Sequence, residues 1–229
     1  MKKVLFVTAF LSVALAISVA CASAPATVPP SSASSASAAS ALETATSQGA
    51  RVFVIDAGKS EARFIINEVL NGAPNTVVGR TNRVQGSIAA SYDHPSAATM
   101  TPLTVDLSGL ATDSAMRNRM IQGTILETGN PAFQIAEFDM TKLEGMPDKV
   151  TIGQPFDFKI TGKLTLHGVT KEVTFDATVT PVSDTQLTGR ASLQIAYADF
   201  GVGVFRMPPQ VASVANTTIL EIDFVAIAQ

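Results

Sequence analysis

Few side chains in this sequence are of the types that carry out covalent catalysis. The chain has one cysteine, Cys21, and two histidines, His94 and His167. No G-x-S-x-G motif occurs, and two distant histidines without a cluster of Cys or Glu do not form a zinc site. Because an enzyme needs an activated nucleophile, a poised acid–base pair or a metal, the sequence favours binding, without a cofactor or metal, over catalysis.

Two arginines and one histidine are candidates for contacting the head group of a ligand. Arg117 and Arg119 lie in a segment with helical spacing, and a planar guanidinium pairs well with a carboxylate or phosphate. The alternative for both is an ordinary salt bridge or a solvated charge. His167 either contacts a head group at a pocket mouth or sets the geometry of a turn, and we favour the turn.

The beginning of the chain resembles a secretory signal peptide. A short basic region is followed by an apolar run at residues 4–19 and by small residues around Cys21. We therefore expect residues 1–22 to be a signal peptide and the protein to be exported. The sequence around Cys21 resembles a bacterial lipobox, in which the thiol is lipidated. Cleavage after Ala22 is the alternative, and we favour lipidation because this is the only thiol.

Residues 23–50 consist almost entirely of Ala, Ser, Thr and Pro, a composition typical of a flexible linker. We expect a periplasmic protein, anchored to the outer membrane if Cys21 is lipidated. Removal of Lys2 and Lys3 with the signal would lower the formal net charge from −3 to −5. An acidic chain lacks the electrostatic footprint of a nucleic-acid binder. The oligomeric state stays open.

The remaining residues, 51–229, form one predicted domain whose hydrophobic pattern has mostly period two. Apolar residues alternate with polar ones around residues 62–66, 103–107, 156–166, 173–179, 193–197 and 220–226, which indicates half-buried strands. His167-Gly168 lies between two such runs and predicts a tight hairpin. One segment differs: Asp113 or Ser114 can cap a short helix that reaches Ile121. This pattern predicts an all-β fold, an antiparallel sandwich or a barrel, with one short helical segment.

A barrel of about eight strands can enclose one small ligand, and the inward positions of these strands are mainly apolar. Two alternatives follow: a cavity for an aliphatic molecule, or a filled core in a structural or interaction module. The candidate cavity-lining residues are Phe64, Ile66, Phe156, Phe158, Leu164, Phe175, Ile195 and Phe224.

One segment carries a specific resemblance. The sequence GKLTLHGVTKEV at residues 162–173 closely resembles the hallmark hairpin of the YceI-like family. Other landmarks of that family follow in order over nearly all of residues 51–229. They are Asp56, Ser60-x-Ala62-x-Phe64, Val78-Gly79, Val84-x-Gly86-x-Ile88, Arg117-Asn118, Pro131-x-Phe133, Ala136-x-Phe138, Ala198-Asp199-Phe200-Gly201 and the closing run at 218–226.

The resemblance implies an extended antiparallel barrel, similar to lipocalins, that carries a polyisoprenoid or a fatty-acid derivative, and it favours a cavity over a filled core. It also implies a periplasmic or secreted protein. The sequence departs from the family at Glu68, where a histidine is frequent, at Asn118, where an aspartate is usual, and at Ala198, where an arginine is frequent. Arg117, Glu68 and His167 are therefore the candidate head-group residues.

Overall fold

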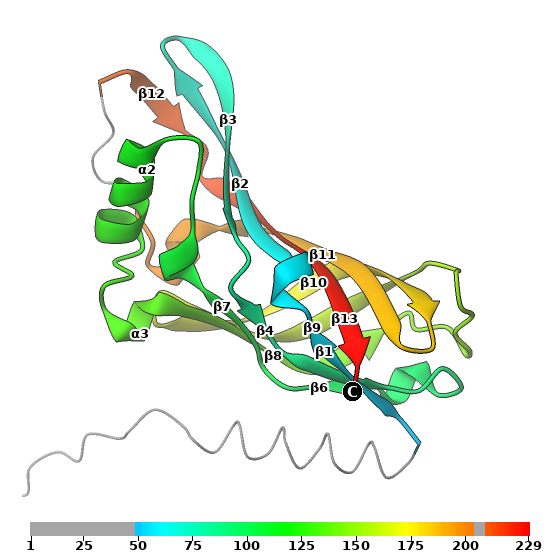
Figure 1. Ribbon diagram of the computed structural model, residues 1–229. Helices are drawn as coiled ribbons and strands as arrows, with labels where there is room; N and C mark the ends of the chain where they lie inside the picture. The colour runs from blue at the N-terminus through cyan, green and yellow to red at the C-terminus, as the bar shows by residue number, and fades with distance from the viewer. Residues whose placement is uncertain (1–48, 204–208) are drawn as a thin grey trace, which may run out of the picture. The chain divides into compact units, whose positions relative to one another are not determined.

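The computed structural model describes residues 49–203 and 209–229 (Figure 1). The predicted signal peptide at 1–22, its Cys21 and nearly all of the predicted linker at 23–50 lie outside the described residues. Within them, thirteen strands form a single sheet. The strands are β1 Arg51–Ile55, β2 Glu61–Leu70, β3 Ala73–Thr81, β4 Val84–Gln85, β5 Ser87–Ala90, β6 Thr99–Met100, β7 Leu103–Asp106, β8 Ile135–Glu144, β9 Phe156–Leu166, β10 Val169–Ser183, β11 Gln186–Ala196, β12 Val211–Val214 and β13 Thr217–Ala228.

The sheet is antiparallel and curls on itself. One path runs β4-β7-β8-β9-β10-β11-β13-β1-β5-β6, while β2 pairs with β3, β12 and β13. The last strand, β13, is the branch point: β11 covers one edge over its whole length, and β2 and β1 share the other edge. β4 pairs with β7 at one end of this path, and in sequence it directly follows β3, which pairs with β2 beside β13. This connection curls the sheet back on itself. The predicted all-β antiparallel barrel is confirmed. Among the described residues the strands number thirteen rather than about eight, and five of them, β4, β5, β6, β7 and β12, are only two to four residues long.

Hairpin turns fix the register of the long strands. His167 and Gly168 have φ of 50° and 75°, so both lie in the left-handed region that a two-residue hairpin requires. Leu166 then pairs with Val169. Asn71 and Gly72, with φ of 50° and 79°, form the same kind of turn between β2 and β3. The tight hairpin predicted at His167-Gly168 is confirmed.

The helical segment begins where the sequence predicts. The Ser114 side chain accepts a hydrogen bond from the Arg117 backbone at 3.4 Å and caps α2, Ala115–Met120, which continues as a π-helical turn at Ile121–Ile125. A second short helix, α3 Pro131–Gln134, was not expected. This helix forms because Asn130 caps it and Pro131 occupies its first position, where a missing N–H costs nothing. Single 3-10 turns occur at Ala57–Lys59, Pro95–Ala97, Leu107–Gly109 and Tyr197–Phe200.

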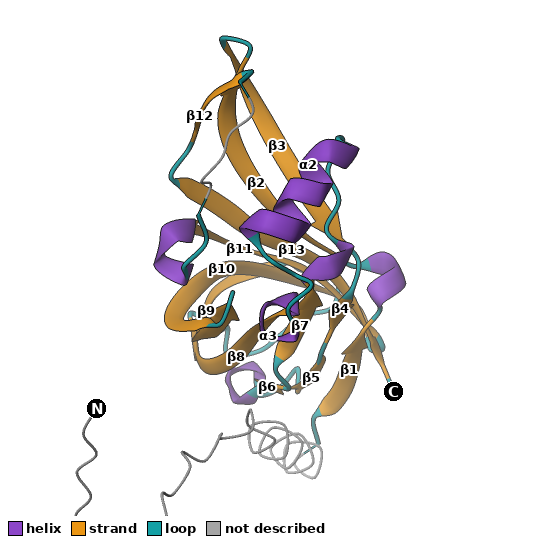
Figure 2. Cartoon of the chain, turned by 90° about the vertical axis from the view of Figure 1, so that its left-hand side faces the viewer, coloured by secondary structure: helices purple, strands orange, loops and turns teal. Residues whose placement is uncertain are grey.

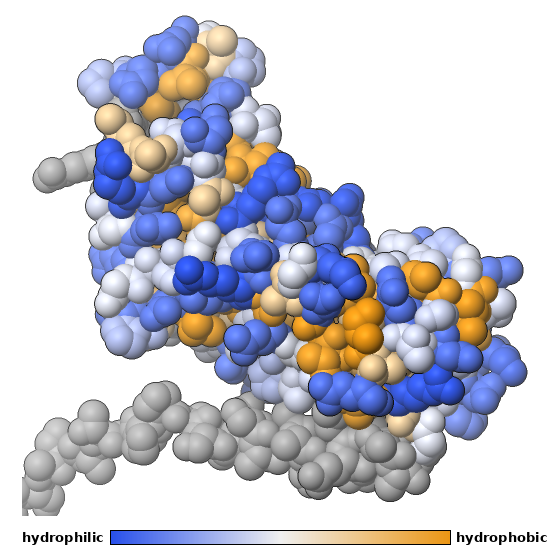
Figure 3. Space-filling model, in the orientation of Figure 1, coloured by the Kyte–Doolittle hydropathy of each residue, from blue (hydrophilic) through white to orange (hydrophobic). Residues whose placement is uncertain are grey.

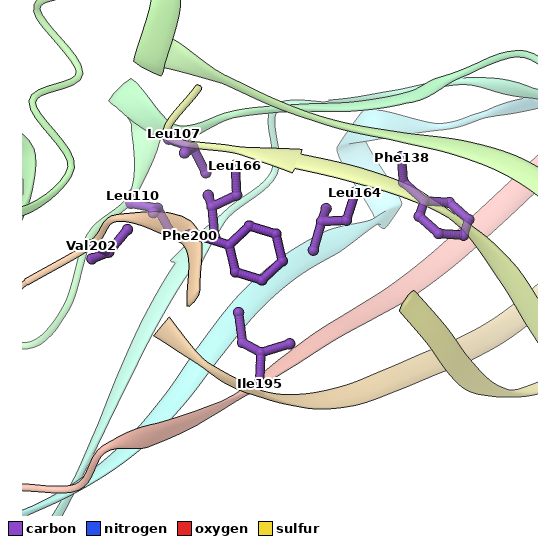
Figure 4. Packing of buried hydrophobic residues seen from close by; sticks show 8 residues of the cluster. All are labelled: Leu107, Leu110, Phe138, Leu164, Leu166, Ile195, Phe200 and Val202. Atoms are coloured by element: carbon purple, nitrogen blue, oxygen red, sulfur yellow. The ribbon is translucent and has the colours of Figure 1, made fainter. Parts of the chain in front are cut away.

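Two groups of buried side chains hold the sheet together. One contains Leu107, Leu110, Phe138, Leu164, Leu166, Ile195, Phe200 and Val202 (Figure 4). The other contains Phe53, Ile55, Ala62, Val84, Leu187, Ile222 and Ala226. Phe200 is only 1% exposed, and Gly201 behind it ends the 3-10 turn with φ of 70°. Burial of Phe200 explains the Asp199-Phe200-Gly201 landmark as a packing motif.

On the face shown in Figure 3, hydrophilic side chains predominate and hydrophobic ones form small groups between them. Such a surface fits strands that place polar residues outward and apolar residues inward. No helix within residues 49–203 and 209–229 is long and apolar enough to cross a membrane.

Candidate binding cavity

The interior of the curled sheet is not filled. A cavity of about 320 Å³ lies between α2, the half of β2 that ends at Leu70 and the inner faces of β8, β9, β10 and β13. Its volume is at the lower end of the range for small-molecule sites, about 300–1,000 Å³. Figure 2 shows α2 and β12 flanking the part of β2 and β3 that extends beyond the rest of the sheet, and both contribute lining residues. We call this space the first cavity.

A second cavity of about 160 Å³ lies towards the other end of the sheet. It is bounded by the start of β9, the end of β10, the start of β11 and the chain around Tyr92 and Met100. Its volume is close to that of an engineered apolar cavity of roughly 150 Å³ that stays dry and binds benzene. We call this space the second cavity.

All eight predicted cavity-lining residues border one of the two cavities. Five of them line the first cavity: Phe64, Ile66, Leu164, Phe175 and Ile195. Four line the second cavity: Phe156, Phe158, Phe175 and Phe224. Only Phe175 borders both. The alternation pattern thus identified the inner faces of β2, β9, β10, β11 and β13, but not the division of the interior.

Glycines on neighbouring strands keep two of these rings against the wall. Phe64 pairs across strands with Gly79, and Phe224 pairs with Gly189. A Cβ placed on Gly79 would lie 2.1 Å from the Phe64 ring, and one on Gly189 would lie 2.7 Å from the Phe224 ring. The rings therefore lie over the glycine backbones, where any side chain would push them into the cavity.

The polar end of the first cavity is built around Glu68. This residue is at an inward position of β2, and its side chain is 7% exposed. Glu68 Oε1 accepts a hydrogen bond from Asn75 Nδ2 at 2.8 Å and one from Arg117 Nη2 at 3.3 Å. Both Glu68 and Arg117 line the cavity. Two of the three predicted head-group residues are thus brought together.

Arg117 is already paired with two carboxylates, since its other Nη atom bonds Asp113 one helical turn earlier. The guanidinium is therefore shared between Glu68, which lines the cavity, and Asp113, which is 84% exposed and does not line it. The neighbouring Asn118 has a structural task. Its Oδ1 accepts bonds from the backbone N–H and the hydroxyl of Thr112, both at 2.7 Å, which anchors the chain leading into α2.

Sequence reasoning missed Asn75 and Asp113, although signals for both were present. A two-residue turn at Asn71-Gly72 places Glu68 opposite Asn75 on the facing strand. Asp113 precedes Arg117 by four residues, the spacing of an ion pair on a helix.

His167 lies apart from this arrangement. It belongs to the turn between β9 and β10 and is not among the residues that line the first cavity. Its ring packs on Phe133 with a centroid distance of 4.1 Å, and its Nε2 is buried without a hydrogen-bond partner among the described residues. Arg119 and His94 are exposed, and neither lines a cavity. In the part of the chain that the structure describes, no group of three or more His, Cys, Asp or Glu could hold a metal ion.

The outer face of the wall carries an ion network. Arg63 Nε donates to Glu221 at 2.7 Å and its Nη1 to Asp223 at 2.6 Å, while Arg190 donates to both Asp223 oxygens at 2.6 and 3.0 Å. The hydrogen bonds from Arg190 lower the pKa of Asp223, burial opposes this effect, and the bond from Arg63 adds to it. The network joins β2, β11 and β13 at the branch point of the sheet.

Comparison with known proteins finds a matching family and solved structures of the same fold. A family profile described as a YceI-like domain matches residues 53–226. A polyisoprenoid-binding domain from Saccharophagus degradans, implicated in plant cell wall breakdown, has the same fold with a TM-score of 0.59 and 18% identity, covering 77% of this chain and 98% of that one. BcnA from Burkholderia cenocepacia has a TM-score of 0.59 and 19% identity, covering 75% and 98%. A search of curated proteins finds no match.

Proposed function

The chain belongs to the YceI-like family, and from this premise we propose that it is a carrier that holds an apolar amphiphile inside its barrel. The observation that carries the proposal is the unfilled interior: about 320 Å³ beside α2, lined mainly by apolar side chains of β2, β8, β9, β10 and β13. A structural module with a filled core, the alternative, does not need this space. The description of the Saccharophagus domain as polyisoprenoid-binding supports the same class of ligand.

Affinity in such a site comes from removing an aliphatic chain from water, at roughly 0.8 kcal/mol per buried CH₂ group. A dry apolar cavity cannot distinguish one aliphatic chain from another by hydrogen bonds. Selectivity between ligands therefore rests on the head group of the ligand and on the length of the cavity that holds its tail.

The polar end favours a neutral head group. The only guanidinium beside Glu68 among the described residues is that of Arg117, and it already bonds Glu68 and Asp113. A carboxylate ligand would meet the buried carboxylate of Glu68 beside a guanidinium that is already shared with Asp113, whereas a hydroxyl or carbonyl group can exchange hydrogen bonds with Glu68, Asn75 and Arg117 without a charge penalty. We therefore propose a prenyl or acyl compound with an uncharged head as the preferred ligand.

We also propose export and a lipid anchor, on sequence grounds alone. The signal-like residues 1–22 and the lipobox-like position of Cys21 support a periplasmic carrier tethered to the outer membrane through residues 23–50. Such a tether would keep the cavity near a source of apolar ligands. Metabolic labelling with a palmitate analogue tests the anchor: incorporation that disappears in Cys21→Ala supports it, and labelling that persists overturns it.

A matched pair of ligands tests the carrier function. Farnesol and farnesoic acid have the same chain and differ only in the head group. The proposal predicts saturable binding of farnesol to the purified protein and weaker binding of farnesoic acid at neutral pH. Absence of binding for both compounds would contradict a carrier, and tighter binding of the acid would contradict the neutral head group.

A further inference from the structure

The boundary between the two cavities consists of a single layer of side chains. Four residues line both cavities: Leu103 of β7, Phe138 of β8, Phe175 of β10 and Ile222 of β13. Along β8 and β13, the inward residues on the two sides of the layer line different cavities: Ala136 and Leu220 line the first, and Met140 and Phe224 line the second. On β10, Phe175 is followed by Ala177 and Val179, which line only the second cavity.

Two aromatic rings form the centre of this layer. Phe138 and Phe175 meet edge to face, with centroids 5.1 Å apart and an interplanar angle of 79°, the favourable geometry for an aromatic pair. Phe138 is 5% exposed. The pair is held by the packing of the strands, and no hydrogen bond locks either ring.

The fifth strand at this level contributes no side chain. On β9, Ile160 lines the second cavity and Leu164 the first, and Gly162 is the inward position between them. A Cβ on Gly162 would lie 2.7 Å from Cζ of Phe138, so the Phe138 ring occupies the space that a side chain would fill. Gly162, the first residue of the segment that resembles the family hairpin, thus leaves room for the Phe138 ring of the aromatic pair.

The head-group end lies on the far side of the first cavity from this layer. Ile222 pairs with Ala62 at the start of β2, and Glu68 is three inward positions further along that strand. A ligand whose head group contacts Glu68 therefore points its apolar tail at Phe138 and Phe175.

We propose that the Phe138–Phe175 pair is a partition that sets the length of the bound chain, and that the second cavity is a tail subsite for apolar chains too long for the first. This inference rests on the proposed carrier function and deepens it. By comparison with a cavity of roughly 150 Å³ that holds benzene, the first cavity takes roughly a dozen carbons and the second about six more. Rotation of the Phe175 ring out of the edge-to-face pair would connect the two spaces.

The test uses geraniol, farnesol and geranylgeraniol, each one isoprene unit longer than the last, in competition with a fluorescent apolar probe on the purified protein. We expect wild-type affinity to rise from geraniol to farnesol and then to level off. In Phe175→Ala the partition is open, so geranylgeraniol should bind at least about tenfold more tightly than to wild type, since each additional buried CH₂ is worth about fourfold. Geraniol should change by less than about twofold.

Phe133→Ala is the matched control, because it removes the same side chain at a site that lines neither cavity. Its chain-length profile should equal that of wild type. If Phe175→Ala does not fold, Phe175→Leu provides the same comparison with a smaller expected gain.

The outcomes separate the two claims. If no alcohol of any length binds to wild type, the carrier function fails and the partition fails with it. If the alcohols bind but the ratio of geranylgeraniol to geraniol affinity is the same in wild type and the folded Phe175 variant, the carrier stands and the partition is overturned.

Discussion

The carboxylate of Glu68 on β2 and the guanidinium of Arg117 on α2 are joined by a hydrogen-bonded ion pair, with 3.3 Å between Oε1 and Nη2. The contact fastens the helix to the rim of the first cavity and places a charged pair where the cavity meets its polar end. Because the exposed Asp113 pairs with the same guanidinium, the positive charge of Arg117 is shared between two carboxylates.

Replacing Glu68 with Gln tests whether the negative charge of Glu68 selects the head group. The amide retains the shape of the side chain and removes one negative charge, so farnesoic acid should bind more tightly by about 1 kcal/mol, or about fivefold. Farnesol affinity should stay within about twofold. Competition titrations at neutral pH measure both. Asp157→Asn is the control, because Asp157 is an exposed carboxylate that lines neither cavity. An equal gain for alcohol and acid in Glu68→Gln would contradict a charge effect.

Filling the first cavity should separate stability from binding. Ala136 lines that cavity, and leucine there places its additional carbons in empty space. Ala136→Leu should therefore leave the free energy of unfolding unchanged or higher while farnesol affinity falls at least about tenfold. Ala226 is 0% exposed and lines neither cavity, so Ala226→Leu should lose about 1–3 kcal/mol through overpacking. Urea denaturation compares the two variants; a similar loss in both would indicate a filled core at Ala136.

Gly162 should tolerate no side chain. A Cβ there would lie 2.4 Å from the backbone oxygen of Asp139 as well as close to Phe138, so β8 and β9 would have to separate. Gly162→Ala should lower the free energy of unfolding by roughly 1–3 kcal/mol. Gly123 has open space around it and lies in a helical turn, so Gly123→Ala should be neutral or stabilising. Equal unfolding midpoints in urea for the two variants would contradict the close packing at Gly162.

The outer ion network predicts a loss of stability in acid. The pKa of Asp223 is lowered by hydrogen bonds from Arg190 and Arg63. The pKa of Asp106 is also lowered, because burial raises it but bonds from Ser108, Arg83 and Gln134 together outweigh burial. A carboxylate whose pKa is lower in the folded state stabilises the fold above its unfolded pKa of 3.8. That contribution disappears as the pH falls through the folded pKa.

The urea midpoint of unfolding should thus not vary with pH near neutrality on account of these groups, and it should shift to lower urea as the pH falls below about 4. Asp223→Asn should reduce the steepness of that decline while being less stable than wild type at pH values above it. If the urea midpoint of Asp223→Asn falls with pH as steeply as that of wild type, Asp223 does not contribute to the loss of stability in acid.

The alternation of apolar and polar residues identifies the inner faces of β2, β7, β9, β10, β11 and β13, whereas β3 and β8 were indicated only by the family resemblance. Phe64, Phe175 and Phe224 are inward because side chains alternate strictly along a strand, and local pattern is sufficient for that. Of the strands of two to four residues, only β7 was predicted from its alternation, and β4, β5, β6 and β12 show no readable period. The division of the interior was not predicted either, because it depends on how Phe138 meets Phe175 from a strand two positions away.

The polar end of the first cavity was likewise predicted only in part. The family resemblance led to Arg117 and Glu68 separately, but their pairing requires α2 to fold back over β2 across 49 residues of chain. His167 was assigned both to a turn and to the head group. Its φ of 50° belongs to the hairpin, and the turn interpretation explains its position outside the first cavity. The expected signal peptide, linker and lipidated Cys21 lie outside the described residues and stay predictions.

The most direct test of the account is native mass spectrometry of the protein purified from its own host, combined with lipid extraction of the same sample. The carrier account predicts a bound species in addition to the mass of the chain, recovered in the extract as a prenyl or acyl compound with an uncharged head group. A mass equal to that of the chain alone, unchanged after incubation with farnesol and farnesoic acid, would contradict it and would favour a barrel that acts through its surface.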